Sequence, residues 1–181
     1  FGNDGNISQD KLEDCINSDL ANNYGNLCQR VTAFAEKNCS SKVPENKNFN
    51  NDDLIMLNKF TENLERIRQE IDKQNINFYI SFIVSALFEA NKYFNDQEPW
   101  KKKDDKNRLN TIVYTSLEMI RKISYMLYPI IPNSIDKALK IFNLNSKDIN
   151  LESIASHNHL KAGNDINKID ILFRKIEKKD D

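Results

Sequence analysis

Glycine and proline are scarce in this sequence, which has four of each among its 181 residues. The glycines stand at positions 2, 5, 25 and 163, so none lies between residues 26 and 162. Tight turns commonly use glycine, whereas the interior of a helix disfavours it. The scarcity of glycine therefore predicts an all-α fold of long helices with few tight turns.

Cysteine and histidine are also few, and their spacing fits neither a disulfide framework nor a metal centre. Cys15, Cys28 and Cys39 are odd in number and lie 13 and 11 residues apart, so we interpret them as reduced, mostly buried thiols of a cytoplasmic protein. His157 and His159 supply too few ligands for a metal, so we interpret them as plain surface residues. We expect neither a metal site nor a bound cofactor in this chain.

Motifs of catalysis and of membrane insertion do not occur in the sequence. It has no Gly-rich phosphate loop and no H-E-x-x-H, G-x-S-x-G or C-x-x-C motif, so we expect no catalytic residue. No apolar run reaches about 18 residues, and the first residues do not form a signal peptide, which predicts a protein that is neither membrane-anchored nor secreted. The chain starts without Met, so we expect it to begin inside a longer polypeptide.

Charge of neither sign is in excess. Lys and Arg total 26 against 27 Asp and Glu, and the net charge is −1. This balance excludes the globally basic surface of a protein that coats nucleic acid without regard to sequence. Any contact with nucleic acid must therefore be a local patch.

The spacing of apolar residues at intervals of three and four predicts about five helices. We expect them over residues 8–37, 51–74, 76–94, 109–127 and 132–142. The third is apolar nearly all round, which predicts that it is the most buried helix. Long helices joined by short loops are typical of an up-and-down bundle.

The C-terminal part of the sequence is polar and weakly periodic. We expect residues 1–155 to form the helical bundle and residues 156–181 to form a tail that packs back on the bundle or on another domain of the longer polypeptide. Within the tail, the alternating pattern of residues 169–173 suits a short strand or a packing segment. The sequence leaves these two alternatives open.

Trp100, the single tryptophan, follows Pro99 and precedes Lys101, Lys102 and Lys103. An aromatic face beside positive charge suits an unpaired base that stacks on the indole while the lysines hold its phosphates. In the alternative, Trp100 plugs the loop against the bundle and the lysines are merely solvated. Composition alone favours that alternative.

Asn26 and Arg30 are four residues apart, so both project from one face of the first helix. An amide offers a donor and an acceptor and a guanidinium offers a fork of donors, which together can read the edge of a base. Taken by spacing alone, the two are more often ordinary surface residues.

Four segments stand in a specific order along the chain: residues 1–8, residues 16–22 with 25–27, the run from Asn91-x-Tyr93 to Pro99-Trp100, and residues 127–132, Leu-Tyr-Pro-Ile-Ile-Pro. Together they resemble the C-terminal part of bacterial methionyl-tRNA synthetases. The resemblance implies that the bundle is an anticodon-binding domain that follows a catalytic domain. The sequence departs from the family pattern at Tyr24, where an aliphatic residue is usual, and at Arg174, where a Pro is usual.

Asn26, Arg30 and Trp100 match the positions where the family places a base-reading Asn, a base-reading Arg and a stacking Trp. The resemblance implies that they recognise the CAU anticodon of methionine tRNA, above all its wobble cytosine. It also implies that the full-length protein is a cytoplasmic methionine–tRNA ligase, with ATP bound in its catalytic domain. The expected partners are methionine tRNA and that catalytic domain, with no membrane.

Two alternatives remain open from the sequence. The chain could be the same module of another class I synthetase, in which case the match at Asn26, Arg30 and Trp100 is a coincidence. It could also be a helical adaptor that binds a partner protein through an apolar helix face. A charge swap at the three lysines distinguishes tRNA binding from the adaptor, because only tRNA binding would be lost in a salt-dependent way.

Overall fold

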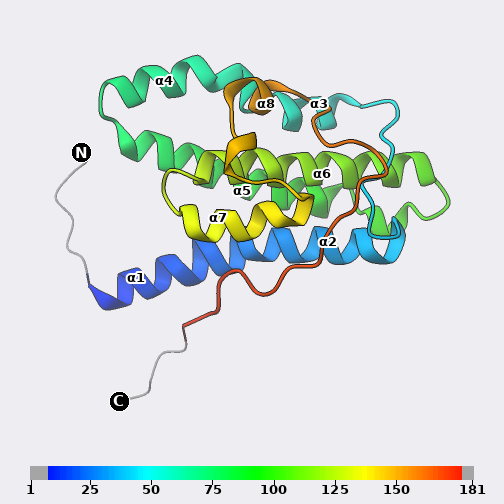
Figure 1. The fold of residues 1–181 in the computed structure, drawn as a ribbon, viewed down its shortest axis with the longest axis horizontal. Helices are drawn as coiled ribbons and strands as arrows, with labels where there is room; N and C mark the ends of the chain where they lie inside the picture. Colours follow the sequence, from blue (N-terminus) through cyan, green and yellow to red (C-terminus); the bar gives the residue numbers. More distant parts are fainter. Residues whose placement is uncertain (1–7, 177–181) are drawn as a thin grey trace.

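The computed structural model describes residues 8–176, which form a bundle of helices (Figure 1). The elements are α1 (Gln9–Cys15), the π-helical η1 (Ile16–Gly25), α2 (Asn26–Asn38), α3 (Asn51–Asn58), η2 (Thr61–Asn63), α4 (Leu64–Asp72), α5 (Ile76–Asp96), η3 (Pro99–Lys101), α6 (Lys106–Leu127), α7 (Pro132–Leu139), η4 (Lys140–Phe142), η5 (Ser146–Asp148) and α8 (Leu151–Ala155). The predicted all-α class is confirmed. Most of the first resembling segment and the end of the tail, 177–181, lie outside the described residues.

The first helix is continuous over residues 9–38, close to the predicted range, because α1, η1 and α2 follow one another without a break. In η1 the helix is wider, and the amide of Asn26 donates to the carbonyl of Ala21, five residues earlier. A Cβ atom on Gly25 would lie 3.7 Å from the ring of Phe173. That distance is an ordinary contact, whereas the carbonyl oxygen of Leu20 would lie at only 3.3 Å, so it is the backbone of η1 that favours glycine here.

The predicted second helix is wrong in one respect, since it is two helices, α3 and α4, with the short turn η2 between them. The side-chain amide of Asn63 donates to the carbonyl of Lys59 at 2.8 Å, which takes the acceptor that a continuous helix would give to a backbone amide. Thr61 donates from its hydroxyl to the carbonyl of Ala155 at 3.2 Å. These side-chain bonds favour the break and tie it to the end of α8.

The central helix is α6, so the prediction that the third helix, α5, would be the most buried is wrong. Every residue of α6 from 111 to 127 is buried, whereas α5 exposes 64% of Phe88 and 41% of Ile80. In Figure 1, α6 runs through the middle of the bundle, and it contacts α2, α3, α5 and α7. The sequence predicted α5 as the most buried helix because α5 has more apolar residues. α6 contains several charged residues, and these side chains are buried.

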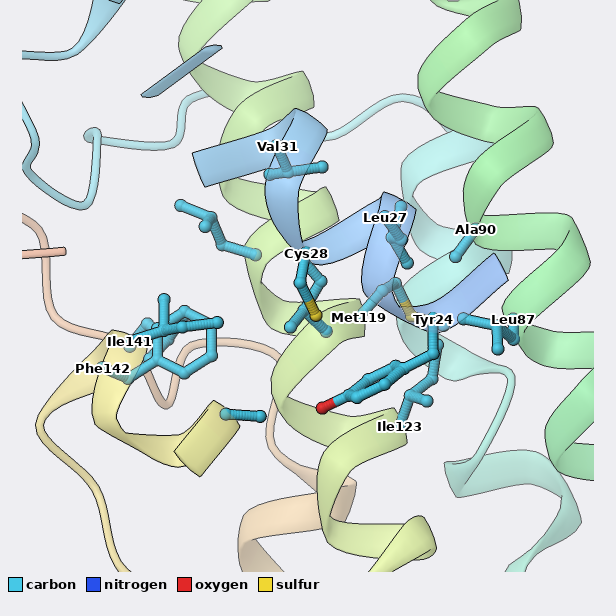
Figure 2. Packing of buried hydrophobic residues seen from close by; sticks show 14 of the residues in the cluster. Tyr24, Leu27, Cys28, Val31, Leu87, Ala90, Met119, Ile123, Ile141 and Phe142 are labelled. Carbon is cyan, nitrogen blue, oxygen red and sulfur yellow. The ribbon is translucent and has the colours of Figure 1, made fainter. Parts of the chain in front are cut away.

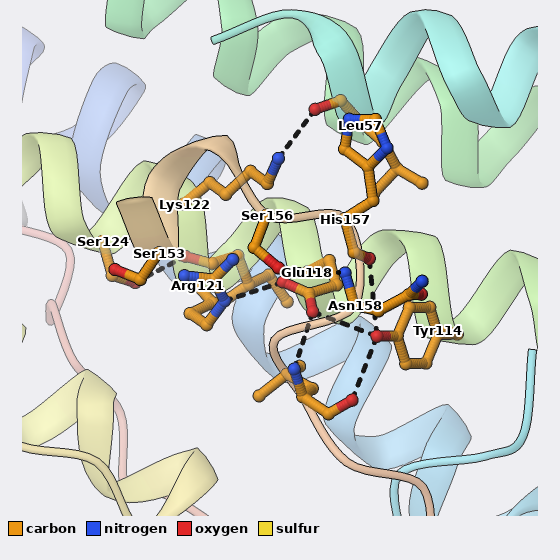
Figure 3. Close-up of polar contacts among 12 residues, drawn as sticks. Leu57, Tyr114, Glu118, Arg121, Lys122, Ser124, Ser153, Ser156, His157 and Asn158 are labelled. Carbon is orange, nitrogen blue, oxygen red and sulfur yellow. Dashed lines mark hydrogen bonds and ion pairs between the residues drawn. The ribbon is translucent and has the colours of Figure 1, made fainter. Parts of the chain in front are cut away.

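These buried charges bond in part to one another and to the backbone (Figure 3), although Nη1 and Nη2 of Arg121 have no hydrogen-bond partner among residues 8–176. The carboxylate of Glu118 accepts hydrogen bonds from Arg121 Nε at 2.7 Å, from the amide of Leu160 at 2.7 Å and from the hydroxyl of Tyr114 at 3.1 Å. Lys122 Nζ donates to the carbonyl of Leu57 at 2.7 Å. Paired charges of this kind can be buried where isolated ones cannot. The network joins α6 to the segment that follows α8 and to α3.

The apolar core between the first helix, α5 and α6 surrounds Tyr24 (Figure 2). Tyr24 is fully buried, and its hydroxyl is 2.7 Å from the hydroxyl of Ser124 on α6. Ser124 thus satisfies the polar group that Tyr24 brings in place of the family's aliphatic residue. The ring of Tyr24 also meets Phe173 edge-on, with 6.2 Å between ring centroids.

The three cysteines are free thiols, but their environments differ. Cys28 is buried, and burial raises its pKa to about 12, so it stays protonated. Cys15 is exposed and Cys39 is half-buried. The prediction of mostly buried thiols is therefore right for Cys28 and wrong for Cys15, because the N-terminal turns of the first helix project beyond the core.

The segment after α8 packs back on the bundle. The amide of Val43 donates to the carbonyl of Asn164 at 2.8 Å, and the amide of Ile166 donates to the carbonyl of Ser41 at 2.7 Å. Leu160 and Ile166 are buried. Residues 169–173 form no strand and instead pack against the core. Of the two alternatives for this run, the packing segment is therefore the correct one.

The histidines of this segment, which we interpret as plain surface residues, are half-buried. Burial, together with the positive charges of Lys122 and Arg121, lowers the pKa of His157 and of His159. Within residues 8–176, no group of three His, Cys, Asp or Glu side chains is placed to hold a metal ion. None of the helices in this range has the length and apolarity needed to span a membrane.

Candidate functional site

Arg30 lies on α2 at the junction with the end of α5. Its Nη2 donates to the side-chain oxygen of Asn95 at 2.5 Å, and its guanidinium carbon is 5.6 Å from the centroid of the Phe94 ring. A hydrogen bond and a cation–π contact thus hold the side chain from two sides. Because a guanidinium has five N–H donors, the bond to Asn95 leaves others available.

Trp100 approaches the same phenylalanine from the turn η3. Its ring meets Phe94 edge-on, with 6.1 Å between centroids and 71° between the planes, and 40% of the residue is exposed. The indole therefore packs on the bundle and still presents a face to solvent. A shallow hollow of about 260 Å³ lies beside it, lined by Arg30, Ala33, Phe34, Lys37, Phe94 and Trp100.

Asn26 is half-buried one helical turn before Arg30. Close by, the side-chain amide of Asn91 on α5 donates to the side-chain oxygen of Asn23 at 2.7 Å and to its carbonyl at 3.3 Å. The side-chain oxygen of Asn91 is buried and has no hydrogen-bond partner among residues 8–176. A polar seam therefore runs between the first helix and α5, from Asn23 to Arg30.

The three lysines after Trp100 are all exposed, but they differ in their partners. Lys101 Nζ lies 2.8 Å from the carboxylate of Glu98, which partly neutralises it. Lys102 and Lys103 form no ion pair within the described part of the chain. Of the three predicted phosphate contacts, Lys102 and Lys103 are therefore the better placed.

Sequence reasoning missed three residues of this site: Lys37, Asn91 and Asn95. The signal for two of them is present, since Asn91 and Asn95 are four apart on α5, as Asn26 and Arg30 are on α2. The abundance of asparagine in this chain hides that pair. Lys37 is two turns from Arg30 along α2 and carries no motif, so only the fold places it at the hollow.

Comparison with known proteins places the chain among synthetases. Residues 43–181 match the family model described as the anticodon binding domain of methionyl tRNA ligase. The methionine–tRNA ligase of Brucella suis biovar 1 is 38% identical over 142 residues, which cover 78% of this chain and 28% of that protein. The methionine–tRNA ligase of Thermotoga maritima is 31% identical over 182 residues, covering 99% of this chain and 29% of that protein.

A solved structure agrees with the sequence relatives. The free-state crystal structure of Mycobacterium tuberculosis methionyl-tRNA synthetase superposes with a TM-score of 0.90 at 29% identity, over 99% of this chain and 37% of that one. The chain thus spans about a third of the length of the proteins it matches. The family-model match includes Trp100 and the lysines but begins after Asn26 and Arg30, which fall within the Thermotoga match.

Proposed function

The chain belongs to the family of anticodon-binding domains of methionyl-tRNA ligases, and from this premise we propose that it binds the CAU anticodon of methionine tRNA. In this proposal the whole protein attaches methionine to that tRNA in the cytoplasm. ATP is consumed in a catalytic part of the polypeptide outside this chain, and the chain selects the tRNA. The names of the relatives favour this reading over another class I synthetase.

The observation that carries the proposal is the meeting of Arg30 and Trp100 at Phe94. The two residues are 70 positions apart in the sequence, yet both line one hollow. A flipped-out base needs a face to stack on and donors at its edge. Trp100 offers the face and Arg30 offers the donors, and Asn26 adds an amide one turn away on the same helix.

This arrangement favours cytosine over uracil at the wobble position. Cytosine presents two adjacent acceptors, O2 and N3, to a guanidinium, whereas uracil presents an N–H donor at N3. A donor of Arg30 that faces another donor is left unpaired, and an unpaired buried donor costs about 1–3 kcal/mol. The amide of Asn26 supplies a further donor and acceptor for the edge of the same base.

Lys102 and Lys103 would then hold phosphates beside the stacked base. Such contacts supply affinity that does not depend on sequence and that falls as salt rises. Lys37, which lines the hollow from α2, adds a further positive charge. The net charge of −1 is compatible with this local patch.

Binding of a CAU anticodon stem-loop to the chain tests the proposed function. We expect the wild-type chain to bind it in preference to a stem-loop with an unrelated anticodon. Replacement of Lys101, Lys102 and Lys103 by Glu should abolish most of that binding and flatten its dependence on salt. A wild-type chain that shows no preference for the CAU stem-loop would reject the proposal and favour a helical adaptor for a protein partner, whereas binding that is unaffected by the charge swap would show that these lysines do not hold phosphates.

A further inference from the structure

The turn that carries Trp100 has a backbone that needs support. α5 ends at Asp96, and Glu98 then adopts a left-handed conformation with φ 45°. This conformation is costly for a residue with a side chain and persists where the surroundings enforce it. Pro99 is buried and starts the short helix η3, on which Trp100 is the next residue.

Gln97, which directly precedes Glu98, ties this turn to two other helices. Its side-chain oxygen accepts from Arg108 Nη2 on α6 at 2.6 Å, and its side-chain nitrogen donates to Asp52 of α3 at 2.9 Å. Both bonds reach other helices, since Asp52 lies on α3, far back in the sequence, and Arg108 lies near the start of α6, the next helix after the turn. Gln97 is therefore the residue through which the bundle holds the Trp100 turn.

Arg108 is itself held rigidly. Its Nη1 and Nη2 donate to the two carboxylate oxygens of Asp53 at 2.6 and 2.9 Å, which is the bidentate geometry of a strong pair. Asp53 is fully buried, accepts from the hydroxyl of Tyr93 and accepts from the amide of Asn50 at 2.9 Å. With these partners the carboxylate has little freedom, so Arg108 presents Nη2 to Gln97 in a fixed direction.

We propose that Gln97, anchored by the Arg108–Asp53 pair, is a positioning residue that holds the Trp100 indole against Phe94 and open to the hollow beside Arg30. Its importance for binding rests on the proposed function of Trp100 as a stacking residue. Without the bond from Arg108, the turn gains freedom. A base would then have to order the indole as it binds, at the expense of affinity.

Trp100 is the only tryptophan of the chain, so its fluorescence reports on the turn directly. The test compares Gln97→Ala, Gln97→Glu and Trp100→Ala with the wild-type chain. Glu89→Ala is the matched control, because Glu89 also lies on α5 and pairs at 2.5 Å with Lys59, the residue that directly follows α3. Thermal unfolding and affinity for a CAU stem-loop are measured for each protein, and acrylamide quenching of Trp100 without RNA is measured for each protein except Trp100→Ala.

We expect Gln97→Ala to raise the quenching of Trp100 and to weaken stem-loop binding by about 3- to 10-fold, the range for one side chain that must be ordered on binding. Gln97→Glu keeps an oxygen for Arg108 but replaces the donor to Asp52 by a carboxylate oxygen, so both readouts should lie between those of Gln97→Ala and the wild type. Glu89→Ala should change neither. Gln97→Met, which keeps the length of the side chain without its amide, replaces Gln97→Ala if that variant unfolds.

Quenching that is unchanged in Gln97→Ala would overturn the proposal, whatever the RNA affinity. The same holds if quenching rises while affinity is unchanged and Trp100→Ala still weakens binding. If Trp100→Ala itself leaves affinity unchanged, the proposed stacking function fails. In that case the quenching result alone decides whether Gln97 positions the indole.

Discussion

Trp100 combines two roles that a sequence alone presents as alternatives. Its ring packs on Phe94, as a loop plug would, and 40% of it remains exposed, as a stacking platform requires. Arg30 shows the same combination, because its bond to Asn95 fixes it while other donors remain available. At the residue scale, the contacts that hold Trp100 and Arg30 in place are ones that a purely structural role would also use.

Replacing Trp100 by Ala should weaken binding of a CAU stem-loop by about 1–3 kcal/mol, the loss expected for one stacking partner. The melting temperature should change little, because much of the indole is already in solvent. The affinity of Trp100→Phe, which keeps a smaller ring, should lie between those of the wild type and Trp100→Ala. Isothermal titration and thermal unfolding measure these quantities, and a large drop in melting temperature would show that the indole is part of the core.

At the scale of elements, the sequence predicts the helices that follow apolar periodicity. The extents of the first helix and of α5 agree with the predicted ranges because their stripes recur at intervals of three and four. The break between α3 and α4 could not be predicted from apolar periodicity. The bond from Asn63 to Lys59 is local, but the contact of Thr61 with Ala155 at the end of α8 exists only after the chain has folded.

The position of α6 escaped prediction for a related reason. A helix with Glu118, Arg121 and Lys122 looks like a surface helix, because such residues are rarely buried unless paired. Arg121 pairs with Glu118 three residues away, but Glu118 and Lys122 also bond to the backbone of Leu160 and Leu57, which lie far away in the sequence. For the candidate site, the sequence supplied Asn26, Arg30 and Trp100 through a family resemblance, whereas Lys37 and the support of the turn by Gln97 required the fold.

Lys122 gives this buried network a testable dependence on pH. Burial and the neighbouring Arg121 lower its pKa to about 8 from an ordinary 10.5. Between these values the unfolded chain binds more protons than the folded one, so the contribution of Lys122 to the free energy of unfolding rises with pH. The rise approaches about 1.4 kcal/mol per pH unit for a full proton.

Urea unfolding of the wild-type chain and of Lys122→Met, at several values from pH 7.5 to 9.5, measures this contribution. The wild type should gain stability relative to the variant as the pH increases. Titration of Cys28, whose pKa is also shifted, is common to both proteins and drops out of the difference. A constant difference across the range would contradict the assigned role of Lys122.

On the scale of the whole molecule, the chain spans about a third of its relatives. We therefore expect purified residues 1–181 to fold and to bind the anticodon stem-loop without catalysing methionine-dependent exchange between ATP and pyrophosphate. The physical reason is that the sequence contains no Gly-rich phosphate loop or other adenylate-forming motif. Exchange activity of the purified chain would refute the expectation that catalysis lies outside residues 1–181.

The ratio of affinities for stem-loops with cytosine or uracil at the wobble position tests the central claim most directly. If Arg30 and Asn26 read the edge of that base, Arg30→Ala and Asn26→Ala should shrink the preference for cytosine, because a missing edge contact removes discrimination as well as affinity. Lys102→Ala is the control and should weaken both stem-loops equally. An intact cytosine-to-uracil ratio in Arg30→Ala and Asn26→Ala would contradict the claim that these side chains read the anticodon.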